Sequence, residues 1–496
     1  MLRKLWNDQA FRHSLLGSVL WSLMAHAYMF LHSLFSHDAL NALYASPGEE
    51  VWKVELGRFL FPVYRALFRG QLLLPWVVGL FFTLWLALTV YLLCKLFNLK
   101  FFWPIFLTAG VLAVNKTVIA LSATYLYELD IDMLSVLFAT LAVYLWKKYK
   151  FGFLWGSLCL LGTLGIYQCN LSVAVVLVIF VSVLELLYGE DGSRPDARDT
   201  SHSGRGESSA VWLRVLLRGL LAIAMILLAG LLYVGALKAS LAMAGTHLVT
   251  DKYNSLTNML APGKNYVRLL INAYRDVKRQ FQTSLGFFAG WVVLLLRAAL
   301  ALFSLVLMIR TVLVKKPGIL NVVLAGVLLL LLPLGMNFSY ILNNGRVHDL
   351  MRFALWLLGL LPVILLENLP EDKRKKTKSN LSQSARSLAF FLLFLLLFNN
   401  VITANAIYLK KDFEQQQTMS LMTRVMDDLN DAAFGPGSAG QEADPTSLTL
   451  CFIGGPQFTA MPGFEPYISL TGVRDASPIP EDTSEYYYNV YKAYLT

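Results

Sequence analysis

Charge is scarce in this chain of 496 residues, because only 15% of them are Asp, Glu, Lys or Arg. Hydrophobic residues make up 56%, and the mean hydropathy is +0.56. Soluble domains carry roughly 25% charged residues and about 45–50% apolar residues. The composition therefore excludes a soluble globular enzyme, a disordered chain and a collagen-like fibre. A membrane-spanning helix needs about 20 apolar residues, so the chain can hold many spans and one small domain.

Cysteines and nucleotide-binding motifs are also few. The spacing of the four cysteines argues against a disulfide framework or a metal site; they are Cys94, Cys159, Cys169 and Cys451. There is no P-loop or other Gly-rich phosphate motif. The net charge of +10 is typical of basic cytoplasmic loops in a membrane protein. We therefore expect membrane lipid as a partner and no nucleic acid.

Long apolar runs predict the fold class. Eleven of them have helical length, which predicts a mainly α, polytopic integral membrane protein with about 11 transmembrane helices. The runs are 14–35, 71–94, 102–123, 131–146, 151–167, 170–188, 212–236, 285–309, 319–341, 350–367 and 387–407. Asn115 and Lys116 interrupt the third run, and the turn at 168–170 joins two runs in a tight hairpin.

The remaining segments predict the domain organisation. Residues 1–407 form the membrane domain, and residues 408–496 have ordinary polarity and form a small extracytoplasmic C-terminal α/β domain. Within that tail, 411–433 has the pattern of a helix and 448–453 that of a strand. Residues 189–210 are rich in Gly, Ser and charge, as in a disordered linker.

Basic residues in the short loops predict the orientation. Lys and Arg in alternate connections, such as 147–150 and 373–376, fall on one side, which the positive-inside rule makes cytoplasmic. The N-terminus and the linker 189–210 are then inside. The long loops 36–70, 124–130, 237–284 and 342–349 lie outside, where we expect the function.

The acids and arginines of the first outer loop each allow two interpretations, one functional and one structural. Asp38 follows the first span, where partial desolvation suits a general base, but Asp is also a common helix cap. Residues 51–70 have the pattern of an amphipathic helix with Arg58, Arg65 and Arg69 on one stripe. These arginines either touch lipid headgroups generally or hold one lipid phosphate through paired hydrogen bonds.

Acids also mark the second outer segment. Glu128, Asp130 and Asp132 enter an apolar helix at its N-terminus, where the helix dipole favours them. Asp132 begins to enter the span, and acids at that depth are functional candidates. In the hairpin, Tyr167 and Gln168 suit either sugar hydroxyls or turn formation.

Further basic residues suggest an anionic ligand. Loop 237–284 has many cations and few acids, against the positive-inside trend; the cations include Lys252, Lys264, Arg268, Arg275, Lys278 and Arg279. Another group precedes the tenth run and comprises Arg346, His348, Asp349 and Arg352. Arg297 lies inside an apolar run and should face protein or a polar cavity.

Three of these segments together resemble a known family. Gly57-Arg58-Phe59, the Tyr-rich acidic stretch 124–132, and Gly165-Ile166-Tyr167-Gln168 resemble the Gtr-type polytopic glucosyl transferases, mainly over residues 10–370. Such proteins are similar in plan to GT-C glycosyltransferases, which take a sugar from a polyprenyl-phosphate sugar at the outer membrane surface. The resemblance implies an enzyme of the cell (inner) membrane. It would move the hexose glucose from a polyprenyl-phosphate donor to a cell-envelope polysaccharide.

The resemblance also implies residue roles. An acid in the first outer loop is typical of the class, and Asp38 matches it best, so Asp38 is the first choice for the catalytic base. Glu128, Asp130 and Asp132 would share that role or orient the acceptor. Residues expected at the lipid phosphate are Arg58, Arg65, Arg69, Arg268 and Arg297. Residues expected at the sugar or acceptor are Glu50, Glu55, Tyr127, Tyr167, Gln168, Arg346 and His348.

A lipid phosphate leaving group is already anionic and needs no general acid, so the reaction would need a base, cations and a single inverting attack. No cofactor is required, although a divalent cation near the acids is compatible with this scheme. Two alternatives stay open, a lipid-pyrophosphate-linked polysaccharide polymerase or ligase and a lipid-linked sugar flippase. A flippase should have charges along a path through the membrane, whereas here the acids cluster at the outer ends.

Overall fold

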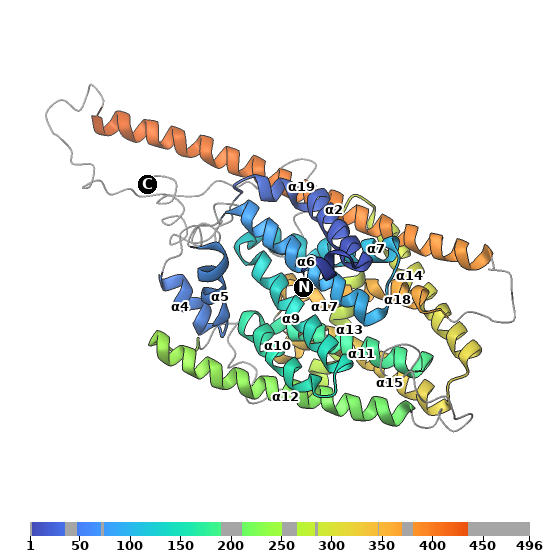
Figure 1. The fold of residues 1–496 in the computed structure, drawn as a ribbon. Coiled ribbons are helices and arrows are strands. Elements are labelled where there is room, and N and C mark those ends of the chain that lie inside the picture. The colour runs from blue at the N-terminus through green and yellow to red at the C-terminus, as the bar shows by residue number, and fades with distance from the viewer. Residues whose placement is uncertain are drawn as a thin grey trace.

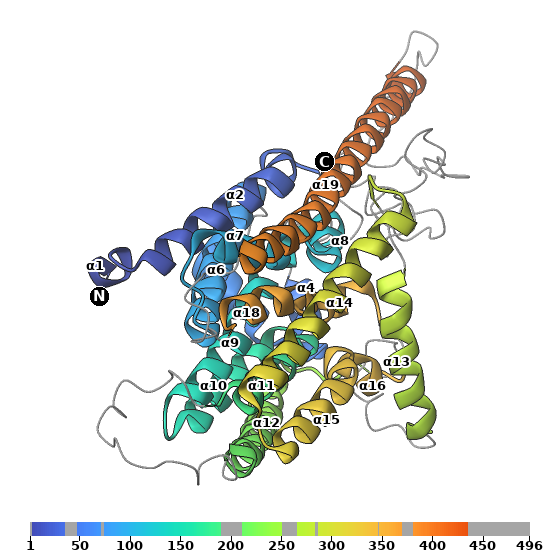
Figure 2. The same cartoon turned by 90° about the vertical axis from the view of Figure 1, so that its right-hand side faces the viewer.

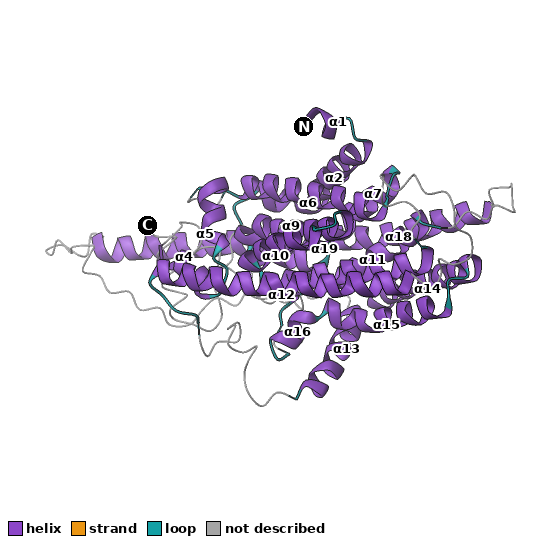
Figure 3. Ribbon diagram, turned by 60° about the horizontal axis from the view of Figure 1, so that its bottom comes forward, coloured by secondary structure: helices purple, strands orange, loops and turns teal. Residues whose placement is uncertain are grey.

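The structure is a computed structural model that describes residues 2–34, 47–70, 74–189, 211–249, 265–282, 286–345, 347–369 and 380–434. The described residues form helices and connecting loops, with no strand among them (Figure 3). Asp38 and Arg346 lie outside the described residues. So do most of the linker 189–210 and the strand expected at 448–453.

The helices are arranged as a bundle (Figure 1). In chain order they are α1 (Leu2–Trp6), α2 (Gln9–Leu31), α4 (Pro47–Glu55), α5 (Leu60–Tyr64), η1 (Arg65–Arg69), α6 (Pro75–Phe97), α7 (Phe102–Ala113), α8 (Lys116–Thr124), η2 (Leu126–Glu128), α9 (Leu129–Lys148), α10 (Gly152–Ile166), η3 (Gln168–Asn170), α11 (Leu171–Tyr188), α12 (Val211–Ala244), α13 (Tyr266–Gln282), α14 (Gly290–Lys315), α15 (Ile319–Met336), α16 (Phe338–Leu342), η6 (Asp349–Met351), α17 (Phe353–Trp356), η7 (Leu357–Leu360), α18 (Leu361–Glu367) and α19 (Asn380–Phe434).

Eight helical segments among the described residues are long and apolar enough to cross a membrane. They are Gln9–Leu31, Pro75–Phe97, Leu126–Lys148, Gln168–Tyr188, Val211–Ala244, Gly290–Lys315, Ile319–Met336 and Gln383–Gln417. The pair α7 and α8 makes a ninth if the two count as one span, although their axes differ by 47°. Long apolar helices in this number are typical of a membrane protein.

The predicted count of eleven spans is therefore not confirmed. All eleven apolar runs contain helix, but Gly152–Ile166 and Phe353–Glu367 are shorter than the others. The 15 residues of α10 rise about 22 Å, less than the roughly 30 Å of a bilayer core. The second short helix begins with the brief elements α17 and η7.

Asn115 explains the break between α7 and α8. Its side-chain oxygen accepts a hydrogen bond from Val118 N at 3.0 Å and so caps the start of α8. Its Nδ2 donates to the carbonyls of Val111 and Leu112 at 3.1 and 3.0 Å, in the last turn of α7. One buried side chain thus satisfies two helix ends, and Lys116 becomes the first residue of α8.

The prediction of a single amphipathic helix over 51–70 is wrong, because the chain forms α4, α5 and η1 there. Gly57 adopts a φ of 80°, a conformation that costs glycine little and ends α4. Arg58 N then donates to Lys53 O at 2.8 Å. Because the chain turns at this point, Arg58 leaves the stripe that it was expected to share with Arg65 and Arg69.

The C-terminal helix α19 packs against α2, α7 and α8 and extends beyond the bundle (Figure 1). The helix expected over 411–433 is its C-terminal part. The expected domain boundary at 407/408 falls inside α19, where Tyr408 is fully buried and its hydroxyl lies 2.7 Å from His26 Nδ1.

Gly110 tests the packing of α2, α7 and α19. A Cβ atom on Gly110 would lie 2.7 Å from the ring of Trp21 and 2.6 Å from Leu397, and Trp21 is fixed by its hydrogen bond to Phe106 O at 2.8 Å. We expect Gly110→Ala to cost about 1–3 kcal/mol of stability through overpacking. The measurement is the melting temperature of the purified protein in detergent.

Gly230→Ala is the matched control, because a Cβ atom there would meet nothing within 4 Å. The control should leave the melting temperature unchanged or raise it, since alanine favours helix over glycine by up to about 1 kcal/mol. Equal melting temperatures for the two variants would contradict the packing argument.

Candidate functional site

A narrow pocket lies between two polar parts of the bundle. One wall comes from the α4–α5 turn and the η3 hairpin, and the other from α16 and η6. Its lining comprises Leu56, Arg58, Tyr167, Gln168, Cys169, Phe338, Ser339, Leu342, Asn343 and Met351. Three residues predicted as site residues, Arg58, Tyr167 and Gln168, therefore meet in one place.

Arg58 is held on one side and open on another. Its Nη1 lies 2.8 Å from Glu128 Oε2, and its guanidinium stacks on the Tyr167 ring at 4.6 Å from the centroid. Burial alone would lower the pKa of Arg58, but the charge of Glu128, together with Tyr167, Cys169 and Tyr127, raises that pKa above its ordinary value, so Arg58 stays charged. Its buried Nε has no hydrogen-bond partner among the described residues.

Glu128 joins α4 and the turn that follows it to the start of α9. Besides Arg58, its carboxylate pairs with the ammonium of Lys53, which also lies 5.0 Å from the Tyr127 ring and 5.2 Å from the Phe61 ring. The Glu128 side chain is only 13% exposed. A carboxylate held by two cations in this way is an anchor for α4 and the Arg58 turn.

Asp130 makes a similar junction with α5 and η1. It is fully buried, accepts a hydrogen bond from the Tyr64 hydroxyl at 2.8 Å, and lies 3.4 Å from Arg69 Nε. Burial and the charge of Asp130 raise the pKa of Tyr64 well above its ordinary value, so the hydroxyl remains a donor. Arg65 is also buried. Arg65 and Arg69 therefore point into the protein.

Asp132 faces the hairpin instead. Asn170 Nδ2 donates to Asp132 Oδ1 at 2.9 Å, and within the described part of the chain no ion pair involves Asp132. Burial raises the pKa of Tyr167 well above its ordinary value, and the charges of Asp132 and Glu128 add to this shift. Asp132 therefore lies beside the hairpin that carries Tyr167 and Gln168.

The hairpin is tied to the α4–α5 turn by backbone carbonyls. Gln168 Nε2 donates to Leu56 O at 3.1 Å and to the Tyr233 hydroxyl at 3.0 Å. That hydroxyl donates to Gly57 O at 3.1 Å. Since α12 supplies Tyr233, three segments fix the wall that carries Arg58.

The other predicted site residues that the structure describes do not line the pocket. Tyr127 packs beside Lys53, and Glu55 accepts a hydrogen bond from the Thr246 hydroxyl. Glu50 lies half-buried at α4 and His348 half-buried before η6. Arg268 is exposed on α13, whereas Arg297 of α14 donates to Phe281 O at 2.7 Å and stacks near Trp356. The expected set of phosphate-binding arginines is thus not brought together as one group.

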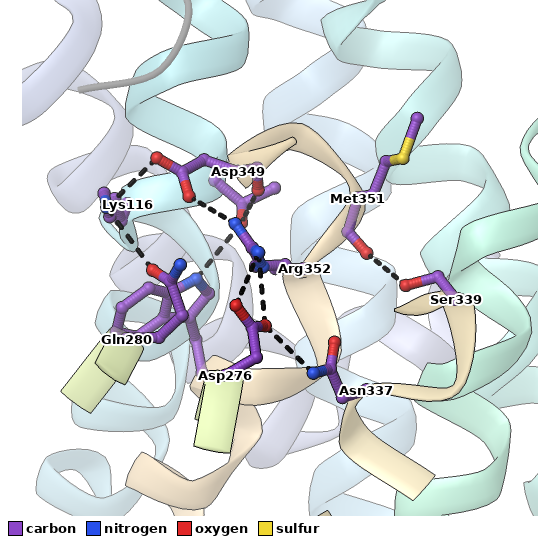
Figure 4. Close-up of polar contacts among 10 residues, drawn as sticks. Lys116, Asp276, Gln280, Asn337, Ser339, Asp349, Met351 and Arg352 are labelled. Carbon is purple, nitrogen blue, oxygen red and sulfur yellow. Dashed lines mark hydrogen bonds and ion pairs between the residues drawn. The ribbon is translucent and has the colours of Figure 1, made fainter. Parts of the chain in front are cut away.

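Behind the second wall lies a polar group of which only Asp349 and Arg352 were grouped from the sequence. It consists of Lys116, Asp276, Gln280, Asn337, Asp349 and Arg352, hereafter the α8–α13 cluster (Figure 4). Asp276 was not predicted as a site residue. The available signal was that Asp276 is the only acid in the basic stretch 266–282.

Among the described residues, no three His, Cys, Asp or Glu side chains are arranged to hold a metal ion. Asp38, the acid expected to lie closest to the reaction, is outside that part of the chain.

Long apolar helices with a polar pocket between buried charges define a polytopic membrane protein. The family model described as Glucosyl transferase GtrII matches residues 27–363, more than half of the chain. The chain therefore belongs to the GtrII glucosyl transferase family, which confirms the resemblance and supports a transferase acting on a sugar donor and an acceptor. No curated protein and no solved structure matched the sequence significantly.

Glu128→Gln tests the anchor. The change leaves Lys53 and Arg58 without their shared counterion, and breaking a buried pair costs about 3–5 kcal/mol. We expect α4 and the Arg58 turn to detach from α9, so that limited trypsin cleaves after Lys53 or Arg58 faster than in the wild type, by about tenfold or more.

Glu185→Gln is the control, because Glu185 pairs with Arg218 at 2.8 Å between α11 and α12, away from this segment. Its cleavage rate between residues 53 and 69 should match that of the wild type. A wild-type rate in Glu128→Gln would mean that apolar packing alone holds the segment.

Proposed function

We propose that this protein transfers glucose from polyprenyl-phosphate glucose to a cell-envelope polysaccharide at the outer face of the cell membrane. The observation that carries the proposal is the position of Arg58, a partly buried arginine in the pocket wall whose buried Nε has no hydrogen-bond partner among the described residues. Family membership supports glucosyl transfer, and the apolar helices around the pocket suit a lipid-linked donor.

The charges at this wall suit an anionic leaving group. Lys53, Arg58 and Glu128 together carry one net positive charge, and the planar guanidinium can donate two hydrogen bonds to phosphate oxygens. Tyr167 and Gln168 in the same lining offer an aromatic face and an amide for the sugar. Arg65, Arg69, Arg268 and Arg297 would act on the phosphate only through the field of the protein or after movement, given their positions.

In the proposed reaction the acceptor hydroxyl attacks the anomeric carbon. Asp38 takes the hydroxyl proton, the new glycosidic bond forms, and polyprenyl phosphate leaves with the electron pair of the broken carbon–oxygen bond. The attack inverts the anomeric centre. Asp132, held by Asn170, would orient a hydroxyl of the sugar or acceptor, while Glu128 and Asp130 fix the wall. No cofactor is needed, and a divalent cation near the acids is compatible with this reaction.

The proposal includes the orientation derived from the basic loops. The N-terminus and the linker 189–210 would be cytoplasmic, residues 1–407 would form the membrane domain, and residues 408–496 would form an extracytoplasmic domain that binds acceptor or covers the site. The part of α19 that extends beyond the bundle would carry that domain.

The test uses the purified full-length protein in nanodiscs with a panel of short-chain polyprenyl-phosphate hexoses. Release of polyprenyl phosphate with the glucose donor, with or without EDTA, would support the proposal and decide the need for metal. No release with any donor, even with envelope polysaccharide and divalent metal added, would contradict it. Lipid-pyrophosphate oligosaccharides and a liposome flipping assay would then test the polymerase and the flippase.

Asp38→Asn should lower turnover by about 10²- to 10⁴-fold, because an amide cannot accept the hydroxyl proton. The control is Asp8→Asn, whose carboxylate pairs with Lys95 at 2.6 Å in another part of the bundle. The control should keep wild-type turnover. Near-normal turnover in Asp38→Asn, with normal melting temperature, would exclude Asp38 as the base.

Arg58→Lys keeps the charge but loses the planar fork and the stacking on Tyr167. We expect the KM for the donor to rise about tenfold or more, the effect of losing one charged hydrogen bond. Arg386→Lys, at an arginine 3.8 Å from Glu367, is the control and should leave KM unchanged. An unchanged KM in Arg58→Lys would remove Arg58 from the phosphate site.

A further inference from the structure

Helix α13 lies at the edge of the bundle and runs across the direction of the long helices (Figures 2 and 3). It packs on α14, α15 and α16 through a narrow buried face made of Leu269, Ala273, Val277 and Gln280. Much of its remaining surface is exposed, including Val267 at 68% and Ile271 at 48%. Because the buried apolar face is small, we expect polar contacts to fix the position of α13.

Arg352 supplies the main polar contact. Its Nη2 lies 2.9 and 3.1 Å from the two carboxylate oxygens of Asp276 on α13. Its Nη1 lies 2.9 Å from Asp349 Oδ1 in η6. One buried guanidinium, 7% exposed, therefore joins α13 to η6.

The rest of the α8–α13 cluster extends this junction in both directions (Figure 4). Lys116 Nζ lies 3.0 Å from Asp349 Oδ2 and 3.4 Å from Gln280 Oε1. Asn337 Nδ2 donates to Asp276 Oδ2 at 2.9 Å and to Ala273 O at 3.2 Å. The side chains that hold α13 thus come from α8, from the start of α16 and from η6.

The same short segments form the second wall of the pocket. Asn337 directly precedes Phe338 and Ser339, and Arg352 directly follows Met351, and all three of those neighbours line the pocket. Ser339 Oγ donates to Met351 O at 3.2 Å and so links the two segments. A shift of α13 would therefore pull on both parts of this wall.

Charge balance makes Arg352 the critical member. The cluster holds two cations, Lys116 and Arg352, against two carboxylates, Asp276 and Asp349. Without Arg352, the buried carboxylate of Asp349 and the partly buried carboxylate of Asp276 would share the single charge of Lys116, and their repulsion would drive α13 away from η6.

We propose that Arg352 is a positioning residue for glucosyl transfer, because it holds α13 and the pocket wall in the arrangement that binds the donor. The proposal rests on the proposed function. If α13 is docked for only part of the time, the apparent affinity for the donor falls by that fraction, while saturating donor restores the docked state. Loss of Arg352 should then raise KM and leave kcat nearly unchanged.

The experiment compares four full-length proteins in nanodiscs: the wild type, Arg352→Met, the double variant Arg352→Met/Asp276→Asn, and the control Arg218→Met. The double variant removes one cation and one carboxylate, so it keeps the charges balanced. The control removes an arginine that pairs with Glu185 far along the chain from this cluster. Amide hydrogen exchange over residues 266–282 and donor kinetics are both measured.

We expect exchange over 266–282 to rise about tenfold or more in Arg352→Met, with a similar rise in KM and little change in kcat. The double variant should recover most of both effects, and the control should show neither. Unchanged exchange in Arg352→Met overturns the proposal, as does a fall in kcat at constant KM or faster exchange with normal KM.

The two proposals fail differently. If the wild type releases no polyprenyl phosphate from any donor, the proposed function fails, and a positioning role in that reaction fails with it. Hydrogen exchange then still decides whether Arg352 holds α13. If the wild type is active and the Arg352 variants have the same exchange and kinetics as the control, the positioning role is wrong but the proposed function stands.

Discussion

The pairing of Glu128 with Lys53 and Arg58 is the contact on which the pocket depends. It brings a segment that precedes α6 in the chain against the start of α9, and it fixes Arg58, the one arginine that lines the pocket among the residues that the structure describes. Ions buried away from water are stable only when they are paired with good geometry and further hydrogen bonds. Here Lys53 and Arg58 are paired with Glu128 and also make cation–π contacts with the rings of Tyr127 and Tyr167, both of which are buried.

Acidic side chains at the start of α9 bind neighbouring segments in the same way. Glu128, Asp130 and Asp132 are spaced by two residues, so around a helix they point in different directions. Glu128 receives α4 and the Arg58 turn, Asp130 receives α5 and η1, and Asp132 receives η3. One helix N-terminus thus organises three segments, and its dipole favours the three negative charges.

Local pattern predicted much of this arrangement and missed its long-range part. Apolar runs gave the helices, and the acids and hairpin residues were recognised as candidates, because periodicity and charge report the local environment of a residue. The break at Gly57 was missed because residues 51–70 keep a helical pattern on both sides of it. Asp276 and Arg352 are 76 residues apart, so no local spacing indicates their pairing.

The electrostatics of the two walls differ in a way that suits the proposed chemistry. The α8–α13 cluster balances two cations with two carboxylates, so its effect on the pocket is mainly mechanical. The opposite wall keeps one excess positive charge at Lys53, Arg58 and Glu128, with Asp132 nearby on a hydrogen bond from a neutral amide. Transfer from a lipid phosphate needs a cation at the leaving group and an acceptor for hydroxyl protons. A fixed neutral wall facing a positively charged one would provide the cation without a large net charge buried among apolar helices, and Asp38 would be the proton acceptor.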